Sequence, residues 1–297
     1  MRRFIVLSVL LIVSSRAGAQ ELEPRAYSPS PTGTHFVVFG VGESSGGVSV
    51  DPALPVQNVS GTIDSVVAAY GQTFGLFGRS ASLALALPYV DAQVKGDVAE
   101  VTRSVTRTGF GDLRLRFTLG LLGSPALSPR EFVRRTPGPA LGASLVVVAP
   151  TGEYFPDKLI NIGANRWSFK PEIGVTWPRG KWYLELTGGV WLFGDNDDFF
   201  GGVVREQEAL TSFQANVSYT FRPRLWLSAG WTHYTGGRTT VDSVRKSDWQ
   251  DNDRYGITLS IPLSTRQSLK FAASRGASTR IGSDFDSYGV SWQMVWF

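Results

Sequence analysis

Charged side chains recur at every second position in several stretches of this 297-residue chain. One stretch places Asp112, Arg114 and Arg116 between apolar residues, and another places Lys170 and Glu172 two residues apart. Residues at i and i+2 lie on the same face of a β-strand, so each set shares one face. Charges of both signs on the inner face of a pore can order solutes by charge, or they can pair with one another and hold the wall together. Both interpretations stay open, and the candidates for the lining of a solute path are Asp112, Arg114, Arg116, Lys170, Glu172, Glu185, Arg254 and Lys270.

The sequence offers little for catalysis or metal binding. It has no Cys and two His, and His233 precedes Thr235 by two residues, which is a weak form of the arrangement in which an imidazole activates a hydroxyl nucleophile. Thr is a poor substitute for Ser, and the sequence places no acidic or amide partner beside this pair. The acidic run at residues 195–198 lacks the spacing of a twelve-residue calcium loop. We therefore expect a protein that is not an enzyme and that holds no metal or cofactor.

The elements that would carry the charges are strands of unusual length. Residues 211–221, TSFQANVSYTF, alternate without a fault between an apolar face and a face of hydroxyl and amide groups. Strands of soluble β-sandwiches usually have about five or six residues and carry charge on the polar face. The length of this stretch instead matches a strand that crosses a bilayer, which needs roughly 9 to 11 residues.

The same pattern predicts twelve strands and two unlike ends. The strands are expected at residues 34–44, 61–76, 80–92, 107–121, 139–150, 165–177, 181–193, 209–221, 224–236, 252–263, 267–275 and 285–297. Short turns are expected at 77–80, 178–181, 222–224 and 264–267, and long loops at 45–60, 93–106, 152–164, 195–208, 237–251 and 276–284. Short turns at one end and long loops at the other are typical of outer-membrane barrels. The exception is the connection 123–138, where we expect a helical turn over Pro129 to Arg134.

Aromatic residues gather near the expected strand ends. They are Trp177, Trp182, Phe221, Trp226 and Trp296 toward the short turns, and Trp167, Trp191 and Trp231 toward the long loops. This placement predicts two aromatic girdles at the membrane interfaces.

The first 19 residues predict export. Arg2 and Arg3 precede an apolar run at 4–13, and the small residues 17–19 offer a cleavage site. About ten apolar residues are too few to span a bilayer, which takes roughly 20. Cleavage would lower the formal net charge from +4 to +1, so nothing favours binding to nucleic acid. The expected organisation is a signal peptide (1–19), an N-terminal segment that could occupy the lumen (20–33) and an outer-membrane β-barrel (34–297).

Five stretches carry a resemblance to a known family. They are LINIGANRWSFKPEIGVT (159–176), GVWLFGDNDDFFGG (189–202), VSYTFRPRLWL (217–227), YTGGRTTVDSVRK (234–246) and SRGASTRIGSDFDSYGVSWQ (274–293). The chain resembles the bacterial family of outer-membrane transporters of the MetA pathway of phenol degradation, over most of its length and more firmly after residue 140. The resemblance implies an outer-membrane barrel associated with uptake of small aromatic or other hydrophobic molecules.

The sequence therefore predicts an all-β protein, a transmembrane antiparallel up-and-down β-barrel of about twelve strands. Twelve lies between eight strands, whose side chains nearly fill the interior, and sixteen, which leave a wide channel, so the lumen should be narrow. We expect a passive channel for small hydrophobic or aromatic solutes in the outer membrane. Its partners would be outer-membrane lipid, the solute, and the barrel-assembly machinery, which would recognise the last strand ending in Phe297. The alternatives are a structural or adhesive barrel without transport and a lipid hydrolase that uses His233.

Overall fold

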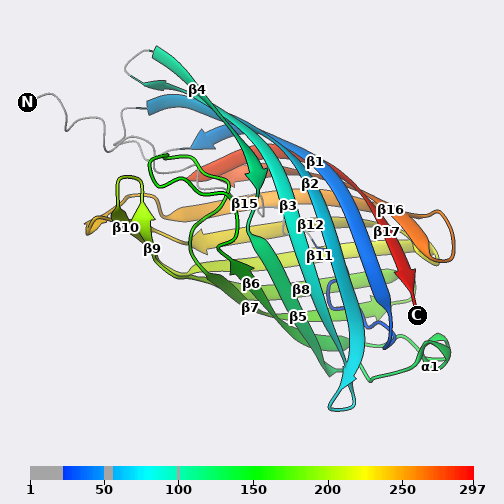
Figure 1. The fold of residues 1–297 in the computed structure, drawn as a ribbon. Helices are drawn as coiled ribbons and strands as arrows, with labels where there is room; N and C mark the ends of the chain where they lie inside the picture. The colour runs from blue at the N-terminus through cyan, green and yellow to red at the C-terminus, as the bar shows by residue number, and fades with distance from the viewer. Residues whose placement is uncertain (1–22, 50–55, 99–100) are drawn as a thin grey trace, which may run out of the picture.

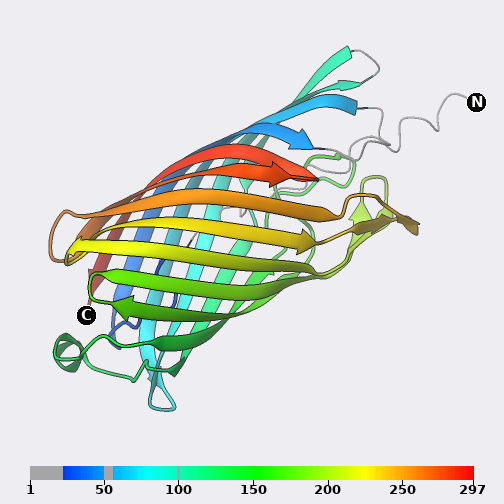
Figure 2. The same cartoon turned by 180° about the vertical axis from the view of Figure 1, so that it is seen from behind.

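The alternating stretches of the sequence are strands of one closed antiparallel barrel (Figures 1 and 2). The computed structural model describes residues 23–49, 56–98 and 101–297. Within these residues the wall consists of β1 (His35–Ser49), β2 (Val56–Leu76), β3 (Arg79–Val98), β4 (Val101–Phe110), β5 (Leu113–Leu122), β6 (Ala140–Ala149), β7 (Ser168–Arg179), β8 (Trp182–Phe193), β11 (Leu210–Arg222), β12 (Leu225–Gly236), β15 (Gln250–Pro262), β16 (Gln267–Thr279) and β17 (Gly282–Trp296). The barrel closes because β1 pairs with β17 and β2 pairs with both β1 and β3.

The expected twelve-stranded barrel is confirmed, because β4 and β5 share one position in the wall. Both pair with β3, β5 along one half of that strand and β4 along the other half. The prediction of one continuous strand at 107–121 is therefore wrong in detail. Gly111 and Asp112 interrupt the strand and separate β4 from β5. The Asp112 carboxylate accepts hydrogen bonds from the backbone N–H groups of Gly152 and Ala164 at 2.9 Å, which joins this position to a loop instead of to the ladder. The longest strands of the wall are β2 and β3, with 21 and 20 residues, and β4 pairs with the far part of β3 (Figure 1).

Side chains on β11 alternate as the sequence predicts. Ser212, Asn216 and Ser218 are buried inside, whereas Phe213 and Val217 are exposed on the outer surface. Parts of β1 and β2 do not alternate between apolar and polar residues. Val38 and Val67 line the interior, while Phe39 and Val66 are exposed outside, so both faces are apolar along these parts of the strands.

The two ends of the barrel differ as expected. The short turns lie at one end, together with α1 (Pro129–Val133), which is the helical turn predicted within 123–138 (Figures 1 and 2). A capping box stabilises its start: the Glu131 backbone N–H donates to the Ser128 hydroxyl at 3.4 Å, and the Ser128 backbone N–H donates to the Glu131 carboxylate at 2.8 Å. At the other end, β9 (Asn196–Phe199), β10 (Val203–Gln207), β13 (Thr239–Val241) and β14 (Val244–Arg245) form a small sheet from two of the long loops.

The long loop expected at 276–284 is reduced to the two residues 280–281, because both strands continue into it, although β16 and β17 pair with each other only as far as Ser274 and Ser287. β16 continues to Thr279 and β17 begins at Gly282. The Asn252 side chain supports the turn, because it accepts a hydrogen bond from the Arg280 backbone N–H and donates one to the Ile281 carbonyl, both at 2.9 Å. Gly282 has a φ of 116°, a backbone conformation that favours glycine.

The segments expected to direct export lie beyond the described part of the chain. Residues 1–19 fall outside the described residues, so the signal peptide stays a prediction. Within the described residues, no helix has both the length and the apolar character needed to cross a bilayer.

Candidate functional site

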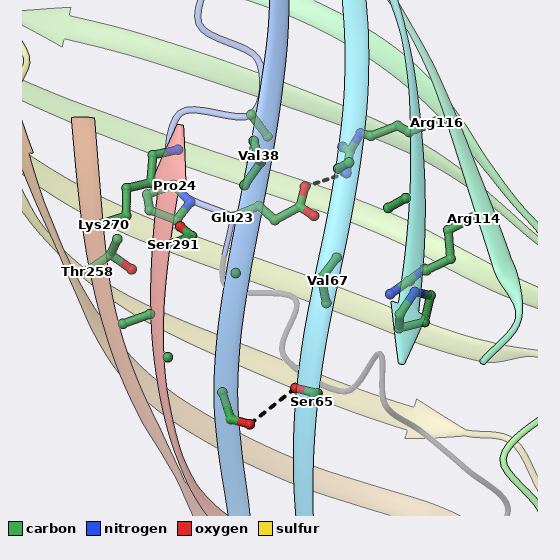
Figure 3. Close-up of a pocket in the computed structure, with 18 of the residues that line it drawn as sticks. Glu23, Pro24, Val38, Ser65, Val67, Arg114, Arg116, Thr258, Lys270 and Ser291 are labelled. Atoms are coloured by element: carbon green, nitrogen blue, oxygen red, sulfur yellow. Dashed lines mark hydrogen bonds and ion pairs between the residues drawn. The ribbon is translucent and has the colours of Figure 1, made fainter. Parts of the chain in front are cut away.

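The lumen holds a cavity of about 720 Å³ (Figure 3). This volume lies within the range of roughly 300–1,000 Å³ that is usual for small-molecule sites. One side of the cavity, which we call the apolar wall, consists of inward side chains from three neighbouring strands: Phe36 and Val38 of β1, Val67 and Ala69 of β2, and Ala84 and Ala86 of β3. Cations border this wall on both sides, with Arg114 and Arg116 on β5 and Lys270 on β16. An apolar surface flanked by positive charges is the main chemical feature of the site.

Residues 23–34, which hold the described part of the segment expected at 20–33, precede the first strand and contact the inside of the barrel, and from here on we call residues 23–34 the N-terminal segment. Its base is tied to the short-turn end, where the Thr32 backbone N–H donates to the Leu127 carbonyl at 2.8 Å and that of Gly33 donates to the Thr73 carbonyl at 2.9 Å. Residues 23–26 line the cavity. The segment therefore narrows the lumen.

Tyr27 anchors this segment to the wall. Its ring is buried over Gly142 and Gly174, which are paired neighbours on β6 and β7. A Cβ atom at Gly174 would lie 2.2 Å from two carbons of the ring, and one at Gly142 would lie 2.7 Å from a third. Only glycine at these two positions leaves room for the ring. The Tyr27 hydroxyl is also 2.8 Å from the Ser144 hydroxyl.

Arg25 forms a second anchor. Its backbone N–H donates to the Glu185 carboxylate at 2.8 Å, and its guanidinium donates to the Thr220 hydroxyl at 2.6 Å. The guanidinium lies 4.4 Å from the centre of the Tyr183 ring and 4.7 Å from that of Trp226, which are cation–π contacts. Burial lowers the pKa of Arg25, while the nearby Tyr183 and Glu185 oppose that shift.

Glu23 brings a carboxylate to the charged side of the cavity. Its Oε2 is 2.5 Å from Nη1 of Arg116, and Nη2 of the same guanidinium is 3.2 Å from Oε2 of Glu172 (Figure 3 shows the first contact). Nζ of Lys170 lies 3.4 Å from Oε1 of Glu172. The Arg116 guanidinium holds the pKa of the Glu23 carboxyl below its usual range, and the charges of Arg114, Lys170 and Lys270 act in the same direction.

The structure brings most of the sequence-predicted site residues to this cavity. Five of them line it: Arg114, Arg116, Glu172, Arg254 and Lys270. Lys170 and Glu185 lie buried in the inner wall, paired with Glu172 and with the N-terminal segment. Asp112 is not among the lining residues and instead holds a loop. Among the described lining residues, five Arg and Lys face two Glu, so ion pairing within the wall leaves an excess of positive charge.

Four aromatic residues of the site were missed by sequence reasoning: Tyr27, Tyr183, Trp191 and Trp226. The expectation that Trp191 and Trp226 belong to girdles is wrong, because both face the lumen. Trp191 lies 5.5 Å from Nζ of Lys170 and 5.8 Å from the Arg114 guanidinium, and Trp226 is 6% exposed. Trp226 lies two residues before the buried Ser228 on β12, so both side chains point to the same face of the strand. This spacing is the sequence signal that would have placed Trp226 in the lumen.

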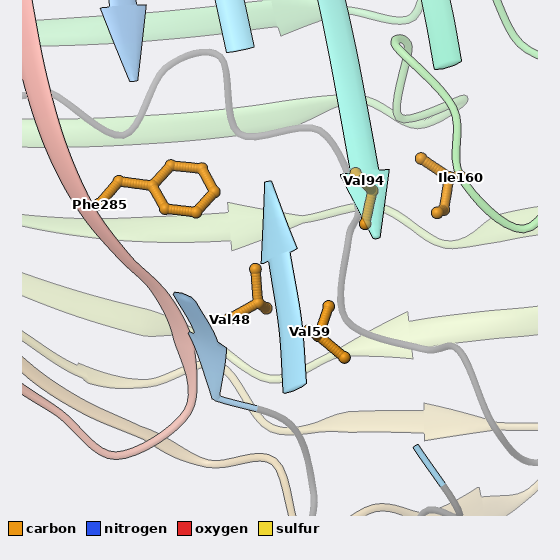
Figure 4. Close-up of a cluster of buried hydrophobic side chains, with 5 residues drawn as sticks. All are labelled: Val48, Val59, Val94, Ile160 and Phe285. Carbon is orange, nitrogen blue, oxygen red and sulfur yellow. The ribbon is translucent and has the colours of Figure 1, made fainter. Parts of the chain in front are cut away.

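The long-loop end of the cavity is narrowed by a small hydrophobic cluster. Val48, Val59, Val94, Ile160 and Phe285 pack together there (Figure 4). Ile160 comes from the loop after β6, which folds toward the barrel axis because Arg107 donates to the Ile160 carbonyl at 2.8 Å and Asp112 accepts from the two backbone N–H groups named above. Burial raises the pKa of Asp112, and the N–H donors oppose that shift.

The structure places acidic partners beside His233, which sequence reasoning missed, but it does not bring the ring to Thr235. Nδ1 of His233 is 3.1 Å from Oδ1 of Asp253, and Nε2 is 3.7 Å from Oδ1 of Asp251. Both ring nitrogens thus face carboxylates, and within the described residues no hydrogen bond joins His233 to Thr235. Across the described ranges no group of three or more His, Cys, Asp or Glu side chains is placed to hold a metal ion.

A closed twelve-stranded barrel of this kind has the porin-like fold of outer-membrane channels. Residues 29–294 match the family described as "Putative MetA-pathway of phenol degradation", and the chain belongs to that family. A comparison with curated protein sequences gave no match.

Solved structures share the fold at low sequence identity. The COG4313 outer membrane channel from Pseudomonas putida F1 is 22% identical, with a TM-score of 0.78 over 93% of this chain and 100% of that one. The β domain of the Bordetella autotransporter BrkA is 11% identical, with a TM-score of 0.52 over 89% and 99%. The KdgM porin in complex with disordered oligogalacturonate is 7% identical, with a TM-score of 0.50 over 88% and 99%. At these identities the likeness concerns the barrel fold.

Proposed function

We propose that the chain is a narrow, passive outer-membrane channel for small solutes with an apolar or aromatic body. The observation that carries this proposal is the apolar wall of the lumenal cavity, inside a barrel whose outer surface is apolar too. Contact with an apolar wall stabilises a solute by about 25 cal/mol for each Å² of apolar surface removed from water. A solute of modest size therefore binds weakly enough to leave again, as conduction requires.

The charged residues of the lumen would have two roles in this channel. Arg114, Arg116, Glu172, Arg254 and Lys270 would contact the solute along its path, because they line the cavity. Lys170 and Glu185 would position that lining and the N-terminal segment through their pairing.

The remaining features of the proposal concern export and assembly. The chain would reach the outer membrane through a cleaved signal peptide and would need no cofactor. Its lipid partner would contact the exposed apolar side chains outside, such as Ile173 and Leu184. The barrel-assembly machinery would recognise the end of β17, where Phe297 is 66% exposed.

The experiment compares two neighbouring alanines of β2 that point to opposite faces. Ala69 lines the cavity, whereas Ala68 is exposed on the outer surface. Single-channel conductance in a planar bilayer and phenol uptake by vesicles containing lipopolysaccharide are measured for wild type, Ala69→Trp and Ala68→Trp. A ring in the cavity should lower both quantities, while a ring on the outside should change neither. Equal behaviour of the two variants would show that the path avoids this cavity, and absence of conductance and uptake in all three would favour a structural barrel.

We also propose that the protein is not a lipid hydrolase, because within the described residues no hydrogen bond links His233 to a hydroxyl that could act as the nucleophile. Purified wild type and His233→Ala are incubated with phospholipid vesicles, and released fatty acid is measured. Both should match the protein-free control. Release by wild type that is lost in the variant would establish the hydrolase alternative.

A further inference from the structure

Two carboxylates share the Arg116 guanidinium, and they are held in different ways. The Glu172 side chain is 6% exposed and belongs to β7, while the Glu23 side chain is 55% exposed and belongs to the N-terminal segment. Glu172 is therefore part of the wall, whereas Glu23 is a tethered group on the surface of the cavity.

Arg116 is oriented without the help of Glu23. Its Nη2 lies 3.2 Å from Oε2 of Glu172 and donates to the Ser144 hydroxyl at 3.2 Å, and these contacts direct Nη1 toward the cavity. A guanidinium fixed in this way is a ready donor to a carboxylate oxygen. Glu23 occupies that donor at 2.5 Å.

More positive charge converges on the same point. Arg114 and Lys270 act electrostatically on the Glu23 carboxylate and line the same cavity, and the close-up shows them on either side of it (Figure 3). A carboxylate is thus the group for which this position is built.

The apolar wall begins directly beside these cations. The cross-strand register places Arg114 next to Ala86, Ala86 next to Ala69, and Ala69 next to Val38. A molecule with its carboxylate at Arg114 and Arg116 would therefore rest its body on these small apolar side chains.

We propose that the cavity binds an amphipathic monocarboxylate, and that Glu23 occupies the subsite for the solute's carboxylate until a solute displaces it. This inference rests on the proposed function, since it names the solute class of that channel. The exchange replaces one carboxylate by another on Arg116, so the charge balance of the cluster is unchanged. Because Glu23 is tethered, it competes at an effective concentration on the order of millimolar.

The test measures binding instead of flux, using sodium benzoate as the probe and equilibrium dialysis of the full mature protein in detergent. Glu23→Gln removes the competing charge and keeps the shape of the side chain. Glu208→Gln is the matched control, because Glu208 is also an exposed carboxylate paired with an arginine, Arg245 at 2.6 Å, in the loops outside the lumen. Val38→Thr changes the apolar wall at nearly constant volume.

We expect Glu23→Gln to bind benzoate about tenfold more tightly than wild type, which corresponds to about 1.4 kcal/mol, the low end for a hydrogen bond to a charged group. Glu208→Gln should bind as wild type does. Acetate should bind at least tenfold more weakly than benzoate because it lacks the apolar body, and Val38→Thr should weaken benzoate but not acetate. Benzyl alcohol, which has the body without the charge, should compete at least tenfold more weakly than benzoate, because only its contact with the apolar wall remains.

Several results would overturn the inference. Equal benzoate affinity of Glu23→Gln and Glu208→Gln would show that Glu23 does not occupy the subsite. Competition by benzyl alcohol as strong as that by benzoate would remove the role of the carboxylate. Tight benzoate binding together with absent conductance and uptake would support the binding site and refute the channel, so the two proposals fail separately.

Discussion

The groove under Tyr27 allows a sharp test of how the N-terminal segment is held. Gly174→Ala would place a Cβ atom 2.2 Å from Cδ2 and Cε2 of the ring. Carbon atoms in ordinary contact are about 3.5–4.0 Å apart, so the ring must move by about 1.5 Å. That movement takes it out of the groove and away from its partner hydroxyl on Ser144.

The size of the effect follows from what the ring loses. Burial of a tyrosine side chain removes roughly 150–250 Å² from water, which at about 25 cal/mol per Å² stabilises docking by about 4–6 kcal/mol as an upper figure. The hydroxyl contact adds about 1 kcal/mol. Loss of half of this sum, about 3 kcal/mol, raises the undocked fraction on the order of 100-fold.

The assay uses the fact that the chain has no Cys. Ala26→Cys places a single thiol on the segment within the cavity, and a polyethylene-glycol maleimide that is too large for the lumen reacts only when the segment is undocked. Gly174→Ala should raise the labelling rate about 100-fold. Gly188→Ala on the neighbouring strand β8 is the control, because its Cβ meets nothing within 4 Å. Equal labelling rates in the two glycine variants would refute the role of the groove.

Three further predictions concern other contacts of the site. Arg25→Gln loses two cation–π contacts worth about 1–2 kcal/mol in total, so the same thiol assay should show about tenfold faster labelling, and an unchanged rate would contradict this. Asp112→Ala leaves two backbone N–H groups without their acceptor, so hydrogen exchange at Gly152 and Ala164 should accelerate at least tenfold while exchange in β11 stays constant. Deletion of Phe297 should lower the heat-modifiable, assembled fraction in outer membranes, and equal yields would argue against recognition of this residue.

The sequence predicts the barrel because its strongest pattern, the alternation within single strands, is local. The eleven alternating residues of β11 identify its inner and outer faces without any other strand. The break at Gly111 and Asp112 could not be found in this way, because it depends on hydrogen bonds from Gly152 and Ala164, 40 and 52 residues further along the chain.

The site could be predicted as far as it depends on the alternation of side chains between the two faces of a strand. This alternation places Arg116, Glu172 and Lys270 in the lumen, and applied to Trp226 it would have placed that ring there too. The groove for Tyr27 was beyond reach, because it exists only when the register of β6 and β7 sets Gly142 beside Gly174. Contacts of this kind depend on the register between two strands, which the sequence of a single strand does not determine.

The partners of the N-terminal segment have a consequence for the order of folding. Tyr27 contacts Ser144 across 117 residues, and Arg25 contacts Glu185 and Thr220 across 160 and 195 residues. Long separations make such contacts slow to form, because the chain between them must be ordered first. The segment therefore acquires its partners only after β6, β8 and β11 have joined the sheet. We expect docking of the segment to follow formation of the part of the wall from β6 to β11, where Ser144, Glu185 and Thr220 lie.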